Sequence, residues 1–205
     1  MSVIDKVVAA VTPPETEQER QQARSKAQAA AAPGDWLSLV ISHHVQIEAA
    51  FAAVKASRSA QERLRAQKAL AILLTGHSNA EESVLYPALS RSGEKSNAAM
   101  AYTEQAAAKT QMAALELLPP MSQDYLDKLE HIRGAVAHHV YEEESTWFLE
   151  LKEKAPASDQ AKLTERYQEE FERYVAGDAR EEDDAVPLAP AASRSVGAPG
   201  RSTHS

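Results

Sequence analysis

The sequence predicts an all-α fold, an antiparallel up-down-up-down four-helix bundle with an N-terminal helical arm and an extra C-terminal helix. Alanine is abundant, whereas glycine occurs only 7 times in 205 residues. Runs of β-branched residues are absent, which favours helix over strand. Four long stretches carry apolar residues at helical spacing, and short turns separate them. Short connections make neighbouring helices run in opposite directions.

The length and composition indicate one domain with a segment on either side. We expect a helical arm over 1–34, the bundle over 35–177, and a disordered tail rich in Ala, Pro and Ser over 178–205. The arm is predicted to begin with a short amphipathic helix over 2–11. The following helix, over 15–32, is polar and rich in alanine, so we expect it to make few core contacts.

Charge and cysteine content exclude several classes of function. The chain has no cysteine and a net charge of −8. The first observation excludes disulfides, zinc–thiolate sites, iron–sulfur clusters and thiol nucleophiles, and the second argues against nucleic acid as a main partner. No apolar run approaches the roughly 18 residues of a membrane span, and the N-terminal apolar run is too short for a secretory signal. We therefore expect a cytoplasmic protein without a membrane partner.

Capping residues and breakers divide the chain into helices. Thr12-Pro13-Pro14-Glu15 has the spacing of a capping box, and Pro33-Gly34 ends the arm. The first bundle helix is predicted over 35–56. Ser59 and Glu62 form a second capping box that begins the next helix. We expect these inward residues in the first two bundle helices: Trp36, Val40, Ile47, Phe51, Val54, Leu70, Leu73, Leu74, Val84 and Leu85.

Breakers and caps also mark the helix boundaries in the second half of the chain. Pro87 is expected to kink or end the second helix, and Gly93 marks the turn before a third helix over 94–118. Ser122 begins a fourth helix, which Pro156 breaks. A last helix over 158–176 is predicted to end at Gly177. We expect these inward residues here: Ala101, Ala108, Met112, Leu115, Leu129, Ile132, Val136, Val140, Trp147, Leu163, Tyr167, Phe171 and Tyr174.

Two pairs of a histidine and a glutamate four residues apart stand out: His77 with Glu81, and His139 with Glu143. Side chains four residues apart share one face of a helix. His77 and Glu81 fall within the leucine face of their helix, where an unpaired carboxylate costs several kcal/mol. Imidazole and carboxylate pairs on facing helices suit a dinuclear metal site in a bundle core.

The fourth helix offers two alignments. His139 and Glu143 lie beside its apolar face, whereas His138 and Glu142 lie farther round, so we choose the first pair. We interpret His131 and His138 as histidines of the surface or of the outer surroundings of the site.

The first and third helices leave choices open. His43 and His44 flank the line of apolar residues on the first helix, and helical periodicity barely distinguishes which of the two faces inward. In the third helix, Glu104 and Gln105 flank the inward arc. Glu104 lies at the same height as Glu81 when residues are counted from the turn near 92, so it is a candidate ligand.

Three stretches resemble the hemerythrin-like family, also called the HHE cation-binding domain. They are SHHVQIEAAF in the first helix, GHSNAEESVLYPAL in the second and AHHVYEEESTWF in the fourth. The resemblance covers about 35–153. It implies a four-helix bundle with a non-haem di-iron site. Members of the family bind dioxygen or nitric oxide, sense oxygen or iron, or handle iron and peroxide.

The resemblance also implies roles for particular residues. His44 matches the first-helix ligand, and Glu81 and Glu143 match carboxylates that bridge the metals. The family often has Glu-His in the third helix, where this chain has Glu104-Gln105. Three alternatives follow: Glu104 rotates inward as a ligand, Gln105 holds a water molecule, or one iron has an open position. The predicted metal ligands are His44, His77, Glu81, Glu104, His139 and Glu143.

These observations favour a di-iron protein that binds or senses oxygen, nitric oxide or iron, more than an enzyme. A site poor in imidazole disfavours reversible oxygen carriage. The expected partners are the metal ion and a small diatomic ligand, with at most a weak homo-oligomer. One alternative is a di-iron enzyme acting on peroxide or oxygen. Another is a metal-free helical interaction protein, and zinc or manganese are alternatives to iron.

Overall fold

A computed structural model describes residues 15–183, and these residues form helices joined by short turns, with no strand in that range. The prediction of an all-α protein is confirmed. The predicted helix over 2–11 and the tail from 184 onward lie outside the described residues. The helices are α2 (Glu17–Ala30), α3 (Trp36–Ala56), α4 (Ala60–Ala80), η1 (Glu81–Leu85), α5 (Tyr86–Arg91), α6 (Lys95–Glu116), α7 (Gln123–Glu142), η2 (Glu143–Trp147), α8 (Phe148–Lys154) and α9 (Ala157–Asp183).

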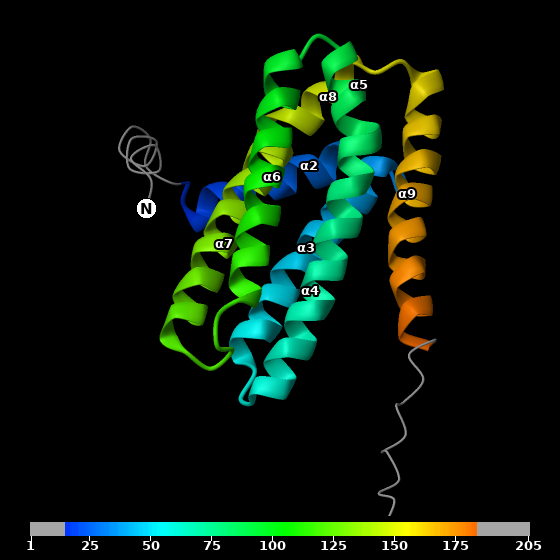
Figure 1. The fold of residues 1–205 in the computed structure, drawn as a ribbon. Coiled ribbons are helices and arrows are strands. Elements are labelled where there is room, and N and C mark those ends of the chain that lie inside the picture. Colours follow the sequence, from blue (N-terminus) through cyan, green and yellow to red (C-terminus); the bar gives the residue numbers. More distant parts are fainter. Residues whose placement is uncertain (1–14, 184–205) are drawn as a thin grey trace, which may run out of the picture.

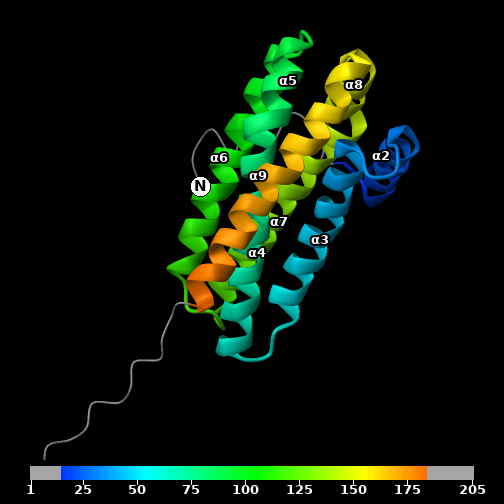
Figure 2. The same cartoon turned by 90° about the vertical axis from the view of Figure 1, so that its right-hand side faces the viewer.

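Four long helical segments lie side by side in the centre of the molecule. Figures 1 and 2 show α3, α4, α6 and α7 with their axes in roughly one direction, and the chain turns back between successive segments. The turn after α5 contains Gly93, whose φ of 108° suits a residue without a Cβ. Helix α9 lies along α4, and α2 crosses the outside near α3 and η2.

Side-chain caps begin the helices where the sequence predicts them. Ser59 and Glu62 form the expected capping box of α4, and Ser122 caps α7. The box expected at Thr12–Glu15 lies largely outside the described residues, and α2 begins with a box at Thr16 and Glu19. Thr16 accepts a hydrogen bond from the Glu19 backbone, and the Glu19 carboxylate accepts one from Thr16 N at 2.6 Å. Thr16 and Glu19 have the same spacing of three residues, which is the geometric requirement of the motif.

Two π-helical turns interrupt the central helices, and each begins at the glutamate of a His/Glu pair. In η1 the Tyr86 N–H donates to the Glu81 carbonyl, five residues back, and in η2 Phe148 donates likewise to Glu143. Pro87 was expected to kink or end the helix; the helix does not end there but continues to Arg91, and the π turn η1 lies just before the proline. Proline lacks an N–H and clashes with the carbonyl four residues back in an α-helix, and the wider π turn relieves both problems. Such turns are frequent at functional sites.

The two outer helices differ from the sequence prediction. Helix α2 was expected to make few core contacts, yet Ala23 and Ala27 are buried, and Arg24 bonds to residues of α3 and η2. Its narrow alanine face packs against the bundle at α3 and η2. Helix α9 was expected to end at Gly177 and instead runs to Asp183, because one glycine within a helix costs only about 1 kcal/mol.

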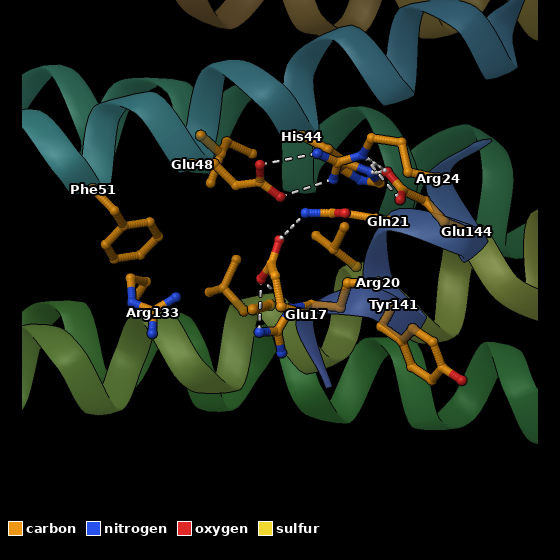
Figure 3. Close-up of a pocket in the computed structure, with 14 residues that line it drawn as sticks. Glu17, Arg20, Gln21, Arg24, His44, Glu48, Phe51, Arg133, Tyr141 and Glu144 are labelled. Atoms are coloured by element: carbon orange, nitrogen blue, oxygen red, sulfur yellow. Dashed lines mark hydrogen bonds and ion pairs between the residues drawn. The ribbon is translucent and has the colours of Figure 1, made fainter. Parts of the chain in front are cut away.

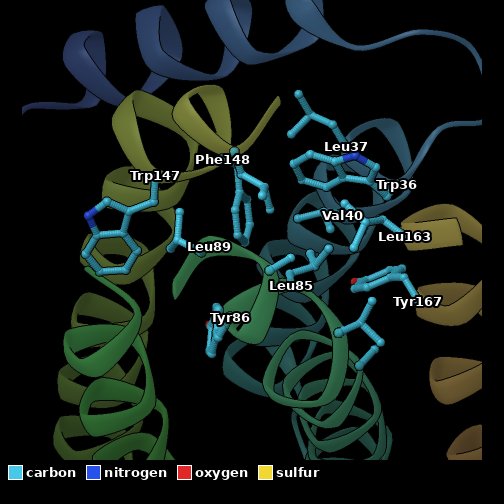
Figure 4. Packing of buried hydrophobic residues seen from close by; sticks show 14 of the residues in the cluster. Trp36, Leu37, Val40, Leu85, Tyr86, Leu89, Trp147, Phe148, Leu163 and Tyr167 are labelled. Carbon is cyan, nitrogen blue, oxygen red and sulfur yellow. The ribbon is translucent and has the colours of Figure 1, made fainter. Parts of the chain in front are cut away.

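The buried apolar residues form two clusters, one on either side of the His/Glu residues. The first gathers aromatic and leucine side chains from the π turns, α8 and α9 around the start of α3 (Figure 4). The second fills the other end of the bundle between α3, α4, α6 and α7. Among the described residues, α3 is apolar and long enough by composition to cross a membrane. It contributes to both clusters, as the core helix of a bundle does. The predicted inward residues of α3 are all buried: Trp36, Val40, Ile47, Phe51 and Val54.

Candidate metal centre

Four side chains from three helical segments direct one ligand atom each toward a common point. They are His44 of α3, His77 and Glu81 at the junction of α4 and η1, and Glu143 at the start of η2. Their atoms all lie within 4.8 Å of one another, and all four residues are buried. His77 Nε2 lies 3.3 Å from Glu81 Oε1, and His44 Nε2 lies 3.2 Å from Glu143 Oε2. Imidazole and carboxylate at this spacing suit a first-row divalent metal.

Both carboxylates present their two oxygens to different neighbours. Glu81 Oε1 faces His77, whereas Glu81 Oε2 accepts a hydrogen bond from the Gln105 amide at 2.6 Å. Glu143 Oε2 faces His44, whereas Glu143 Oε1 lies 3.3 Å from His139 Nε2. A carboxylate with one oxygen on each side has the arrangement of a ligand shared between two metal ions.

On the second side of the carboxylates, His139 meets Tyr86 and Gln105. The Tyr86 hydroxyl lies 3.1 Å from His139 Nε2 and donates to Glu143 Oε1 at 2.8 Å. It also accepts a hydrogen bond from Gln105 Nε2 at 2.6 Å. Tyr86 is completely buried. This hydroxyl therefore lies where the side chains of His139, Glu143 and Gln105 converge.

Tyr86 is a site residue that the sequence analysis missed. Five residues along an α-helix place a side chain about 140° from its starting point, away from Glu81. The π turn η1 removes much of that rotation and turns Tyr86 toward the carboxylates. The available signal was Pro87, because a proline disfavours α geometry in the residues before it.

The three inward histidines each have their outer ring nitrogen paired. His44 Nδ1 lies 2.8 Å from Glu144 Oε1, His77 Nδ1 lies 3.0 Å from the Tyr167 hydroxyl, and His139 Nδ1 lies 2.8 Å from Glu104 Oε2. A partner on Nδ1 fixes the proton there and leaves the Nε2 lone pair free for a metal. In each case Nε2 is the nitrogen that faces Glu81 or Glu143. The partners of two of these histidines, Glu144 and Tyr167, were not identified from the sequence.

The structure distinguishes between the residues that the sequence left as alternatives in the first and third bundle helices. His43 lies 2.9 Å from the Tyr167 hydroxyl and stacks on Phe171, away from the two carboxylates. In the third bundle helix, Gln105 is buried and points into the site, while Glu104 contacts the outer nitrogen of His139. The structure therefore brings the predicted ligands together except for Glu104. The Glu104 carboxylate contacts the outer nitrogen of His139 and does not face the two shared carboxylates. His131 and His138 are exposed, as predicted.

Burial and neighbouring charges set the protonation of these groups. Burial, together with the charge of Glu143, raises the pKa of Glu81 to about 7. Burial also opposes ionisation of Glu143, but the charges and hydrogen bonds of His139 and His44 hold its pKa well below its usual range. Burial alone would lower the pKa of His139, but the charge and hydrogen bond of Glu143, together with the hydrogen bond to Glu104 and the charge of Glu81, outweigh burial and raise this pKa to about 10. Burial, with the charge of His44, keeps the pKa of His77 well below normal. These opposed shifts are typical of a functional site.

The cluster leaves buried polar atoms without a hydrogen-bond partner among the described residues. His44 Nε2, Glu81 Oε1 and Glu143 Oε2 are three of them, and all three point to the same place. Each unsatisfied buried group costs about 1–3 kcal/mol. A single cation at this point would satisfy all three, so the residues present fit a metal ion.

Comparison with known proteins agrees with this geometry. The family model described as "Hemerythrin HHE cation binding domain" matches residues 37–151, more than half of the chain. A curated protein named DNA nickase, from Nostoc sp. (strain PCC 7120 / SAG 25.82 / UTEX 2576), is 31% identical over 98 residues, which is 48% of this chain and 27% of the relative. The chain thus spans about a quarter of that relative's length. No solved structure matched. The matched range includes every inward histidine and both shared carboxylates, and the chain belongs to the hemerythrin HHE cation-binding domain family.

Proposed function

We propose that this protein is a non-haem di-iron protein that binds or senses oxygen, nitric oxide or iron. The observation that carries the proposal is the buried cluster of His44, His77, Glu81 and Glu143, in which three polar atoms without a hydrogen-bond partner converge. One metal would be held by the two histidines of this cluster, and the second by His139, with both carboxylates between them. The supporting helices would form the antiparallel up-down-up-down bundle expected from the sequence.

Iron is proposed because the donors are imidazole nitrogens and carboxylate oxygens in a family of cation-binding domains. Such a ligand set also accepts manganese and zinc, so the metal must be identified by measurement. Bound iron would supply the redox chemistry needed to interact with a diatomic ligand. The chain itself supplies Tyr86 and Gln105 as hydrogen-bond donors beside the second position.

A small cavity beside the site supports a diatomic ligand. Its volume is about 30 Å³, and a water molecule needs roughly 10–15 Å³ on the same scale. The cavity therefore has room for a diatomic molecule. The lining is mostly apolar, with the site's polar groups on one side: Ile47, Leu74, Ala108, Ala135, Val136, Val140, His77, Ser78, Glu104, Gln105 and His139.

The test is the metal content after anaerobic iron loading. Elemental analysis is expected to give about two irons per chain. His77→Ala is expected to lose iron, whereas His138→Ala, which removes an exposed histidine, is expected to retain it. A wild-type chain that retains no iron after loading refutes the proposal and supports a metal-free interaction protein.

Absorption spectra of the loaded protein then identify the ligand. Addition of oxygen or nitric oxide is expected to change the spectrum of the wild type and to leave the spectrum of iron-loaded buffer unchanged. Identical spectra with and without both gases would leave iron itself as the sensed species.

A peroxide-consuming enzyme is the second candidate, and the Tyr86 hydroxyl is the observation that favours it. This buried hydroxyl lies within hydrogen-bond distance of Glu143 and His139, so it is placed to deliver a proton at the second metal position. Catalytic turnover of peroxide by the iron form, absent from the metal-free form and reduced in Tyr86→Phe, would support this function. Rates equal to those of free iron would exclude it.

A further inference from the structure

A chain of charged groups leads from His44 out to the surface helix α2. His44 Nδ1 lies 2.8 Å from Glu144 Oε1, and Arg24 Nε donates to both Glu144 oxygens at 3.1 Å. The two terminal nitrogens of Arg24 donate to Glu48 of α3 at 2.9 and 2.8 Å. His44 and Glu144 are 0% and 1% exposed. The Glu144 carboxylate is therefore buried, and Arg24 is the cation that pairs with it (Figure 3).

Arg24 belongs to a helix that the family model does not include. That model begins at residue 37, whereas α2 spans Glu17–Ala30. A cavity of about 220 Å³ lies between α2, α3 and α7 and reaches His44. Figure 3 shows Arg24 and Glu48 on one side of this cavity and Arg133 and Tyr141 on another. Helix α2 thus forms a wall of the space next to His44.

The other π turn has no such connection. Glu82 follows Glu81 as Glu144 follows Glu143, but Glu82 pairs with Lys109 of α6 at 2.7 Å. The connection from an inward histidine through a buried glutamate to an arginine of an outer helix is therefore a feature of the His44 side.

We propose that Arg24 is a positioning residue for the metal centre, and that docking of α2 and metal binding are coupled through it. The proposal rests on the proposed function. A metal bound to His44 Nε2 requires the ring proton on Nδ1, where it donates to Glu144. Arg24 holds the Glu144 carboxylate in the orientation that accepts this hydrogen bond. Coupling of this kind is reciprocal, so a metal that selects the arrangement also stabilises docked α2.

The experiment titrates the full-length protein anaerobically with ferrous iron, and separately with zinc as a redox-silent ion. Arg24→Gln is expected to raise the Kd of the metal about 10- to 100-fold. Arg24→Lys keeps one charged donor and is expected to recover part of the loss. Arg20→Gln is the matched control, because Arg20 lies on the same helix and bonds to Glu15 and Glu17 at the end of that helix. This control is expected to bind the metal as the wild type does.

Amide hydrogen exchange distinguishes coupling from a purely structural role. A contact that only stabilises the fold would not make the exchange rate of α2 depend on the metal. Amides over 17–30 are expected to exchange more slowly in the metal-loaded wild type than in the metal-free protein, and this difference is expected to shrink in Arg24→Gln. If Arg24→Gln does not fold, Arg24→Lys and the exchange of the wild type decide the question. Equal exchange of 17–30 with and without metal in the wild type overturns the coupling.

The remaining outcomes separate the two proposals. Wild-type metal affinity in Arg24→Gln, with loss of metal in His77→Ala, overturns the positioning role and leaves the proposed function intact. A wild-type protein that binds neither iron nor zinc overturns the proposed function and the coupling with it.

Discussion

The Tyr167 hydroxyl lies between two histidine rings and determines where each carries its proton. It is 3.0 Å from His77 Nδ1 and 2.9 Å from His43 Nδ1. A hydroxyl has one proton, so it accepts from one ring and donates to the other. If His77 binds a metal through Nε2, it donates to Tyr167, and Tyr167 in turn donates to His43.

Removal of this hydroxyl is expected to affect both stability and metal binding. Tyr167→Phe leaves the buried Nδ1 atoms of His43 and His77 without a partner. The free energy of unfolding is expected to fall by about 1–3 kcal/mol, and iron affinity by about 10-fold or more. Urea unfolding and iron titration measure the two effects. Tyr125→Phe, which removes a buried hydroxyl bonded to Gln67, is the control and is expected to lower stability alone. Equal loss of iron affinity in both variants would contradict the role.

His43 is expected to make the metal-free protein sensitive to acid. Burial, with the charge of His44, lowers the pKa of His43 to about 4, compared with about 6.5 in an unfolded chain. Between these values the unfolded state binds more protons, so the stabilisation present above pH 6.5 is lost as the pH falls toward 4. Compared with His43→Gln, the wild type is expected to lose up to about 3 kcal/mol more between pH 7 and pH 4. Urea unfolding at several pH values tests this, with His131→Gln as an exposed control; parallel curves for wild type and His43→Gln would refute it.

At the scale of helices, caps, turns and apolar spacing predicted most of the fold. The capping box at Ser59, the turn at Gly93 and the inward face of α3 were predicted from the sequence because each depends on a local pattern. The π turns were not predicted, because a wider turn leaves no mark in α-helical periodicity beyond Pro87. Their absence from the prediction also explains why Tyr86 was missed. The outer partners Glu144 and Tyr167 depend on tertiary packing, which one sequence does not show.

Gly76 allows α9 to approach α4 closely. A Cβ at this position would lie 3.2 Å from Val175 Cγ2 and 3.5 Å from Phe171 Cδ2. Gly76→Leu is therefore expected to push α9 outward and lower the free energy of unfolding by about 1–3 kcal/mol. Gly134→Leu is the control, because nothing lies within 4 Å of that position. It is expected to be neutral or to raise stability by up to about 1 kcal/mol, since leucine favours helix. Equal effects of both changes in urea unfolding would refute the close contact.

At the scale of the whole molecule, the buried carboxylates of the site are expected to lower the free energy of unfolding of the metal-free protein. Glu81 and Glu143 are both completely buried and lie close together. The pKa of Glu81 is raised to about 7, above the roughly 4.3 of an exposed glutamate. At Glu81 the folded state therefore binds more protons than the unfolded state between these values, so the contribution of this group to stability falls as the pH rises through them. A metal cation reverses this cost and adds about 2.7 kcal/mol at a concentration of 100 times its Kd.

Glu81→Gln tests this balance. At pH 8 and without metal, the variant is expected to have a higher Tm than the wild type, because it lacks the buried charge. Iron is expected to raise the Tm of the wild type, and a chelator to reverse the rise, while the Tm of Glu81→Gln is unchanged by either. Glu82→Gln, which alters a partly exposed neighbour paired with Lys109, is the control and should keep the response to iron. A lower Tm for metal-free Glu81→Gln would contradict the expectation.

The two π turns also limit how the chain can change in length. A π turn contains one residue more than the α turn that it replaces, so the helix beyond it is rotated by about 100° relative to an uninterrupted α-helix. Leu85, Tyr86 and Leu89 enter the core only with that rotation. Loss of one residue within Glu81–Leu85 would therefore turn the far end of the helix outward and disrupt a cluster that lies beyond the site. The packing of the core at this end of the bundle and the positions of the metal ligands therefore depend on the same π turns.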